Sequence, residues 1–113
     1  MFVIAENINI MSRRLGPALK AREVEPIQDM ARRLEAAGAD ALDINLGPAR
    51  KGGDELMRFT IDAVSAVTRL PLCLDTTNAD ALAAGIAHCR ELGLPRPLIN
   101  SFSMQPDKLE HIL

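Results

Sequence analysis

The chain is poor in the residues on which several classes of site depend. Its 113 residues include three Phe, no Tyr and no Trp, with two Cys and two His. So few aromatic rings exclude a stacking platform for single-stranded nucleic acid. Neither Cys73 nor Cys89 has another Cys or His at the spacing of a metal-ligand motif. The sequence therefore predicts buried free thiols and no metal site.

An excess of one charge and long apolar runs are also missing. The 13 Lys and Arg nearly balance the 15 Asp and Glu, for a formal net charge of −2. Such a balance gives no field that would hold a polyanion or an acidic lipid surface. No apolar run approaches the roughly 20 residues that span a bilayer, and Glu6 interrupts the first run before a signal-peptide core could form. We therefore expect a cytoplasmic protein that binds neither nucleic acid nor membrane.

What the sequence does contain is an alternation of apolar runs and amphipathic segments. Runs that end in polar residues predict buried strands, at 2–5, 41–46, 70–75 and 97–100. Apolar residues at helical spacing predict helices over 26–38, 54–68 and 78–93, and a further helix begins at Pro106. The segment around Gly16 and Pro17 is expected to be a loop.

This alternation predicts an α/β fold of parallel (β/α) units with right-handed crossovers. Four such units make the front half of a (β/α)8 TIM barrel, whose usual size is about 250 residues. One domain, residues 1–113, is expected to be the N-terminal half of such a barrel. Because water tolerates open sheet edges and an apolar barrel wall badly, we expect a homo-oligomer, a second chain that completes the barrel, or a longer parent protein.

Carboxamides and a carboxylate recur near the ends of the predicted strands, at Asn9, Asn45, Asp75 and Asn100, with Asp43 two residues before Asn45. Parallel α/β folds gather their functional groups at the carboxyl ends of the strands. Since side chains alternate between strand faces, Asp43 and Asn45 share one face and are predicted to point into the barrel. Inward Asp and Asn without a nucleophile motif suit hydrogen bonding to a heterocycle better than hydrolysis.

A pterin fits this set of groups. Its aminopyrimidinone edge presents an exocyclic amine and a ring N–H side by side, which one carboxylate can accept together. Purely structural roles are the alternative for the same residues. Asp75 could cap the following helix, Asn100 could satisfy a turn, and Asp43 and Asn45 could be a polar pair inside the barrel.

Four blocks of sequence, in order along the chain, carry a family resemblance: Glu6-Asn7-Ile8-Asn9, Gly38–Ala49, Leu72–Asn78 and Ile99-Asn100-Ser101. They resemble the pterin-binding superfamily, whose barrel they match over its front half. Within it they are most similar to the methyltetrahydrofolate:corrinoid (iron-sulfur) protein methyltransferases. The folate modules of cobalamin-dependent methionine synthase are near relatives of that family.

The resemblance implies a role for each candidate residue. Asp75 and Asn100 match the family positions that hydrogen-bond the pterin, and Asp43, Asn45 and Asn9 match positions near its pocket. It further implies transfer of the methyl group of 5-methyltetrahydrofolate to the cob(I)alamin of a partner corrinoid protein, giving tetrahydrofolate and methylcobalamin. Departure of a tertiary amine needs assistance at N5 that grows toward the transition state. The family supplies that assistance from later strands, so no catalytic residue is assigned here.

Two other functions remain as alternatives. A dihydropteroate synthase-like enzyme would carry Thr-Pro-Asp-Ser after the first-strand Asn, whereas this chain continues Ile8-Asn9-Ile10-Met11-Ser12. A non-catalytic pterin-binding or assembly subunit, built as a half-barrel, would bind the ligand without transferring its methyl group.

Overall fold

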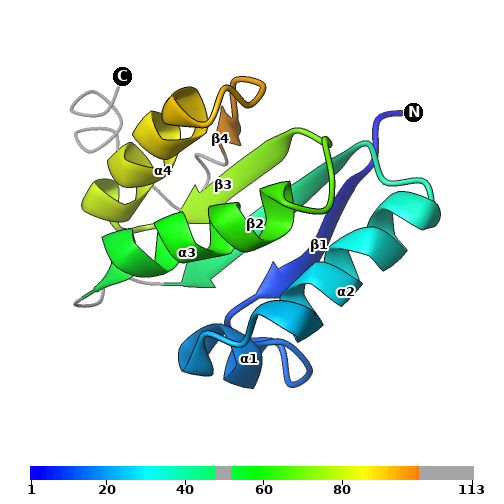
Figure 1. The fold of residues 1–113 in the computed structure, drawn as a ribbon, viewed down its shortest axis with the longest axis horizontal. Helices are drawn as coiled ribbons and strands as arrows, with labels where there is room; N and C mark the ends of the chain where they lie inside the picture. The colour runs from blue at the N-terminus through cyan, green and yellow to red at the C-terminus, as the bar shows by residue number, and fades with distance from the viewer. Residues whose placement is uncertain (48–51, 100–113) are drawn as a thin grey trace.

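A computed structural model describes residues 1–47 and 52–99, which form a parallel sheet with helices packed on one face (Figure 1). The elements, in chain order, are β1 (Ile4–Asn9), α1 (Gly16–Ala21), α2 (Val24–Ala36), β2 (Ala41–Gly47), α3 (Gly53–Ser65), β3 (Leu72–Thr76), α4 (Ala79–Glu91) and β4 (Leu98–Ile99). The strands lie side by side in the order β1-β2-β3-β4, and every neighbouring pair is parallel. The predicted α/β fold of alternating strands and helices is confirmed, while closure into a barrel stays a prediction.

The core lies between the sheet and the helices. The strand register pairs Leu42 with Leu72 and Ile44 with Leu74, so these alternate residues form one apolar face. That face is buried against apolar side chains of the helices, among them Ile27, Met57, Ile61, Val64 and Leu82. The other residues of the same strands, which include the polar candidates, consequently point to the opposite face of the sheet.

The helix ends follow local capping chemistry. Asn78 caps α4, since its Oδ1 accepts from the backbone N–H groups of Asp80 at 3.0 Å and Ala81 at 3.2 Å. Gly38 and Gly93 follow α2 and α4 in left-handed conformations, with φ of 100° and 70°. The predicted helix stops at these two glycines are therefore confirmed.

Two local predictions were wrong. The segment around Gly16 and Pro17 is not a loop but the start of α1, because Pro fits the first turn of a helix as readily as a turn. The first strand runs from Ile4 to Asn9 rather than over 2–5. The β1–β2 register shifts between Ala5 and Ile8. Glu6 and Asn7 therefore lie at an irregularity within β1 and do not end the strand.

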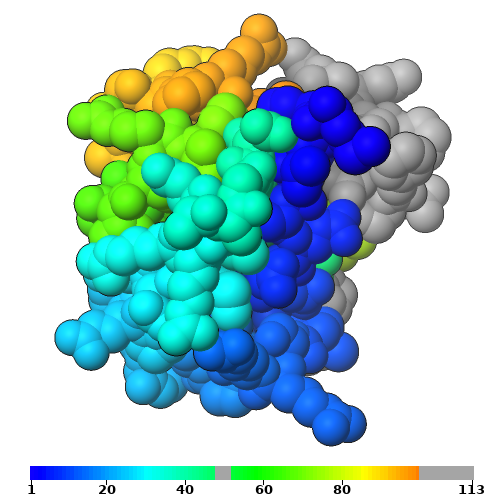
Figure 2. Space-filling model, turned by 90° about the vertical axis from the view of Figure 1, so that its right-hand side faces the viewer, coloured from blue at the N-terminus to red at the C-terminus, as the bar shows by residue number. Residues whose placement is uncertain are grey.

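The β1 edge of the sheet is exposed. Within the described residues β1 pairs only with β2. Viewed from this side, the N-terminal residues and β1 reach the surface beside α2 (Figure 2). Apolar side chains are exposed there, with Phe2 61% and Val3 44% accessible. None of the helices in the described segments is long and apolar enough to cross a membrane.

Among the described glycines, Gly16 has the least room for a side chain, and this supports a first prediction. A Cβ at this position would stand 2.5 Å from the carbonyl oxygen of Ile10. Gly16→Ala should therefore push α1 away from the turn after β1 and lower the free energy of unfolding by about 1–3 kcal/mol, although Ala has the higher helix propensity. Urea denaturation of both proteins measures the difference. Equal stability would show that the contact relaxes at no cost.

Candidate functional site

The sheet register brings three of the predicted polar residues into one row. Asn9 of β1 pairs with Asn45 of β2, and Asn45 pairs with Asp75 of β3. Each lies within two residues of the carboxyl end of its strand. Because Ile44 and Leu74 point into the helix-covered core, Asn45 and Asp75 point to the opposite face. Adjacent strands are about 4.8 Å apart, so a flat ligand can contact more than one of these side chains.

Hydrogen bonds orient the members of this row. Asn45 Nδ2 donates to Asp75 Oδ2 at 3.2 Å, while Asn45 Oδ1 accepts from the backbone N–H of Gly47 at 3.0 Å. The backbone bond thus decides which end of the Asn45 carboxamide meets Asp75. Asn9 Oδ1 accepts from the backbone N–H of Met11 at 2.7 Å. Each carboxamide oxygen accepts from the backbone N–H two residues further along the chain, which limits the rotamers open to it.

Asp43 lies two residues before Asn45, on the same face of β2, and pairs with Cys73 of β3. It is only 3% exposed. Burial, followed by the negative charge of Asp75, raises the pKa of Asp43 to about 6, with a smaller contribution from Glu6. Hydrogen bonding with the Asp75 side chain also raises the pKa of Asp43, while hydrogen bonding with the Cys73 thiol lowers it. A hydrogen bond between two carboxyl groups needs a proton, so Asp43 and Asp75 together form a carboxyl pair that can share one.

The Cys73 thiol acts as a hydrogen-bond donor toward the carboxyl group of Asp43. Burial, followed by its hydrogen bond to Asp43, raises the pKa of the Cys73 thiol to about 12. The thiol therefore stays protonated at neutral pH and is no nucleophile. Cys73 was predicted only as a buried thiol, and the burial of both Cys73 and Cys89 is confirmed. Its place in the site could have been found from strand parity, since it lies two residues before Asp75.

The predicted residues thus fall into two groups. Asn9, Asn45 and Asp75 come together near the carboxyl ends of β1 to β3, and Asp43 lies two residues before Asn45 on the same face of β2. Asn100 lies outside the described residues. The helix-capping role considered for Asp75 belongs instead to Asn78. Asn45 is hydrogen-bonded to Asp75 rather than to Asp43, so the polar contact runs between neighbouring strands.

Thr76 fixes the loop beyond the row and was not predicted. Its hydroxyl donates to the carbonyl oxygen of Gly47 at 3.0 Å and accepts from the N–H of Asn78 at 3.1 Å. These bonds tie the end of β3 both to β2 and to the start of α4. The exit of the chain from β3, immediately after Asp75, is held in place as a result.

A cleft of about 490 Å³ opens at the same end of the sheet, on the helix side. Its lining includes Lys20, Arg22, Leu46, Thr76 and Asn78, but none of the four gathered candidates. The cleft was not predicted from the sequence, because it depends on how α1 packs relative to α3. The four gathered polar candidates and this cleft thus occupy opposite faces of the sheet.

His88, on α4, is mostly covered by neighbouring side chains. Its side chain is 14% exposed and lies between α3 and α4, where Nε2 is 2.7 Å from Asp62 Oδ1. Its other ring nitrogen, Nδ1, is buried and lies 3.8 Å from Glu91 Oε2. His88 is remote from the polar row in the fold. Across the described segments, no group of three or more His, Cys, Asp or Glu is placed to hold a metal ion.

Comparison with known proteins adds a relative with a named activity. No family model matches the chain. The chain is 27% identical, over all of its 113 residues, to a methylcorrinoid:tetrahydrofolate methyltransferase of Eubacterium limosum. The aligned region covers 40% of that protein, so the chain spans less than half the length of this relative. The chain is thus similar, along its entire length, to one part of a methyltransferase that is named for a corrinoid and for tetrahydrofolate.

Proposed function

We propose that this chain forms the pterin-binding part of a methyltransferase that moves a methyl group between folate and a corrinoid protein. The observation that carries the proposal is the row of Asn9, Asn45 and Asp75, with Asn45 Nδ2 bonded to Asp75 Oδ2 at 3.2 Å. This row offers carboxylate and carboxamide groups at the carboxyl ends of parallel strands, where such folds bind ligands. The similarity to a tetrahydrofolate methyltransferase supports the same function.

In this proposal the polar row binds the aminopyrimidinone edge of 5-methyltetrahydrofolate. Asp75, as a carboxylate, accepts from the exocyclic amine and the adjacent ring N–H. Asn45 and Asn9 meet mixed donor and acceptor positions of the ring, and Asn100 joins them from the next strand. Below about pH 6 Asp43 holds the proton of the carboxyl pair, which keeps the negative charge on Asp75, where the ligand is bound.

The reaction proposed is a displacement at the methyl carbon. The bond from this carbon to N5 of the pterin breaks, its electron pair stays on N5, and N5 takes up a proton. The corrinoid protein supplies the nucleophile, the cob(I)alamin that accepts the methyl group. The residues of this chain hold the pterin so that the methyl group faces the partner, and such positioning contributes directly to the rate.

The direction of transfer is part of the test. The resemblance implies 5-methyltetrahydrofolate as the donor, whereas the relative's name gives methylcorrinoid first and tetrahydrofolate second. Both directions pass through one transition state, so the same residues hold the pterin in each. The assay should therefore start once from 5-methyltetrahydrofolate with cob(I)alamin and once from methylcobalamin with tetrahydrofolate.

Calorimetric titration tests the binding step. We expect saturable binding of 5-methyltetrahydrofolate, and much weaker binding of an analogue that lacks the exocyclic amine, because that analogue loses one of the two charge-assisted hydrogen bonds to Asp75. No binding of the folate, or equal binding of both compounds, would overturn the proposal. Binding together with methyl transfer supports the enzyme, and binding without transfer in either direction supports the non-catalytic pterin-binding subunit.

A further inference from the structure

The cleft at the carboxyl ends of the strands, here called the α1–α3 cleft, has a lining of two kinds. Leu19, Leu46 and Leu56 form apolar walls, and Lys20 and Arg22 bring two cations from the end of α1. No acidic side chain is among the described residues that line it. Its volume of about 490 Å³ suits a small organic group. Apolar walls with cations at the rim favour a ligand that joins a hydrophobic body to an anionic end.

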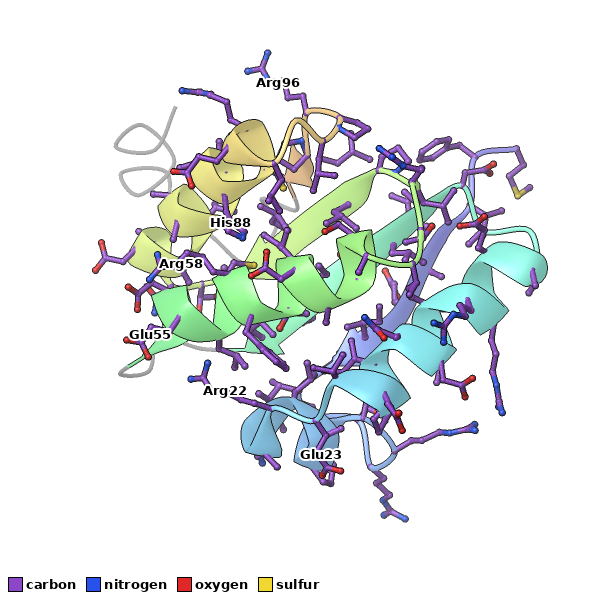
Figure 3. All side chains as sticks on the ribbon, viewed as in Figure 1. Arg22, Glu23, Glu55, Arg58, His88 and Arg96 are labelled. Carbon is purple, nitrogen blue, oxygen red and sulfur yellow. The ribbon has the colours of Figure 1, made fainter. Side chains whose placement is uncertain are left out.

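Arg22 is held in an uncommon backbone conformation that directs it to this cleft. Its φ of 56° is left-handed, and its N–H bonds to the carbonyl oxygens of Ala18 and Leu19. A left-handed conformation is unfavourable for a residue with a Cβ. The guanidinium carbon lies 5.9 Å from the centre of the Phe59 ring on α3. Figure 3 shows the Arg22 side chain extending from α1 toward α3.

The α1–α3 cleft begins where the polar row ends. Ile10 and Thr76 line it, and they directly follow Asn9 and Asp75 in the chain. One step along an extended strand is about 3.3 Å, so the two regions adjoin across the ends of β1 and β3. A ligand whose ring is bound by the row needs only to cross these strand ends to place its other end in the cleft.

We propose that the α1–α3 cleft binds the aminobenzoyl-glutamate tail of the folate whose pterin the polar row binds. The benzoyl ring packs against the apolar walls, and the glutamate carboxylates pair with Lys20 and Arg22. This inference rests on the proposed function. Inorganic phosphate matches the cations but not the walls, whereas the tail matches both.

The test compares 5-methyltetrahydrofolate with 5-methyltetrahydropterin, which has the same ring system and no tail. Both are titrated calorimetrically into wild type, into Lys20→Gln/Arg22→Gln, and into Arg69→Gln/Arg96→Gln. The last variant removes the same charge from the amino-terminal side of β3 and β4, and Figure 3 shows Arg96 far from Arg22. Gln removes the charge and leaves a shorter polar side chain, and both replaced residues of the cleft are exposed.

We expect wild type to bind the folate at least tenfold more tightly than the tailless pterin. Lys20→Gln/Arg22→Gln should lose about tenfold in folate affinity and keep its affinity for the tailless pterin, while the control variant keeps both. Equal binding of the two ligands by wild type, or no loss in the cleft variant, would overturn this inference and leave pterin binding intact. Failure of both ligands to bind wild type would overturn the proposed function as well.

Because Arg22 lies in a left-handed conformation, its replacement could disturb α1. Lys20→Gln alone is therefore measured too, and circular dichroism compares the fold of each variant. A loss of affinity for the tailless pterin equal to the loss for the folate would mean that the cleft variant disturbs the pterin site. Such a result would count against a role of the cleft in binding the tail.

Discussion

Asp75→Asn is expected to weaken the binding of 5-methyltetrahydrofolate by roughly 10²- to 10³-fold, which corresponds to about 3–4 kcal/mol. A carboxylate accepts from both the exocyclic amine and the ring N–H of the pterin. An amide accepts one of these and turns its own donor toward the other, so two donors meet without an acceptor. Charge-assisted hydrogen bonds contribute about 1.5–3 kcal/mol each, and a buried unpaired donor adds a desolvation cost.

The experiment needs a control for the loss of one carboxylate. Asp29→Asn provides it, because Asp29 lies on α2 in an exposed ion pair with Arg33, at 3.2 Å, and on the helix side of the sheet. Calorimetry should give wild-type affinity for Asp29→Asn and the large loss for Asp75→Asn. If a folded Asp75→Asn protein bound the ligand as tightly as wild type, Asp75 could not be the acceptor, and the polar row would lose its central member.

Much of the sheet could be predicted because its signals are local and periodic. Leu42 and Ile44 alternate with Asp43 and Asn45, and this pattern alone decides which face of β2 meets the helices. The parallel arrangement follows from the alternation of strands and helices. Once these two features hold, polar residues at strand ends must gather at one edge. The encounter of Asn45 with Asp75 was therefore within reach of sequence reasoning.

The parts that were missed depend on tertiary packing. Gly16 and Pro17 could form either a loop or a first helical turn. The close fit of α1 against the carbonyl of Ile10 bears on this choice, and the spacing of apolar residues does not show that fit. The register shift within β1 has the same character, since it arises from pairing with β2. The approach of Arg22 to Phe59 joins α1 to α3 across the fold. Consequently the cleft that these segments form could not be predicted from the sequence.

The second large effect expected is on the pH dependence of stability. Asp43 has a pKa of about 6 in the folded protein against 3.8 for the unperturbed group. Between these values the folded state binds more protons than the unfolded state, so stability falls as pH rises. The stabilisation linked to the Asp43 proton is fully present below pH 3.8 and is lost as pH rises through about 6. The shift corresponds to a loss of about 3 kcal/mol.

Asp43→Asn should abolish this fall. An amide stays neutral at every pH and can still donate to Asp75, as the protonated acid does. Urea denaturation from pH 4 to pH 8 should show the variant gaining about 3 kcal/mol relative to wild type as pH rises, with the change centred between pH 4 and 6. Other groups titrate in both proteins and largely cancel in the difference. If the stabilities of wild type and Asp43→Asn changed equally with pH, Asp43 would not have the raised pKa of a buried carboxyl group.

The charged and titratable neighbours of Asp43 allow the cause of this effect to be separated. Burial contributes most to its raised pKa, then the charge of Asp75, and the charge of the exposed Glu6 contributes less. The Cys73 thiol bond acts in the opposite direction. Glu6→Gln should therefore keep most of the wild-type fall in stability, whereas Asp75→Asn should reduce it clearly. If Glu6→Gln flattened the curve as fully as Asp43→Asn, long-range charge rather than the buried pair would control the proton, and Asp43 would not hold it for Asp75.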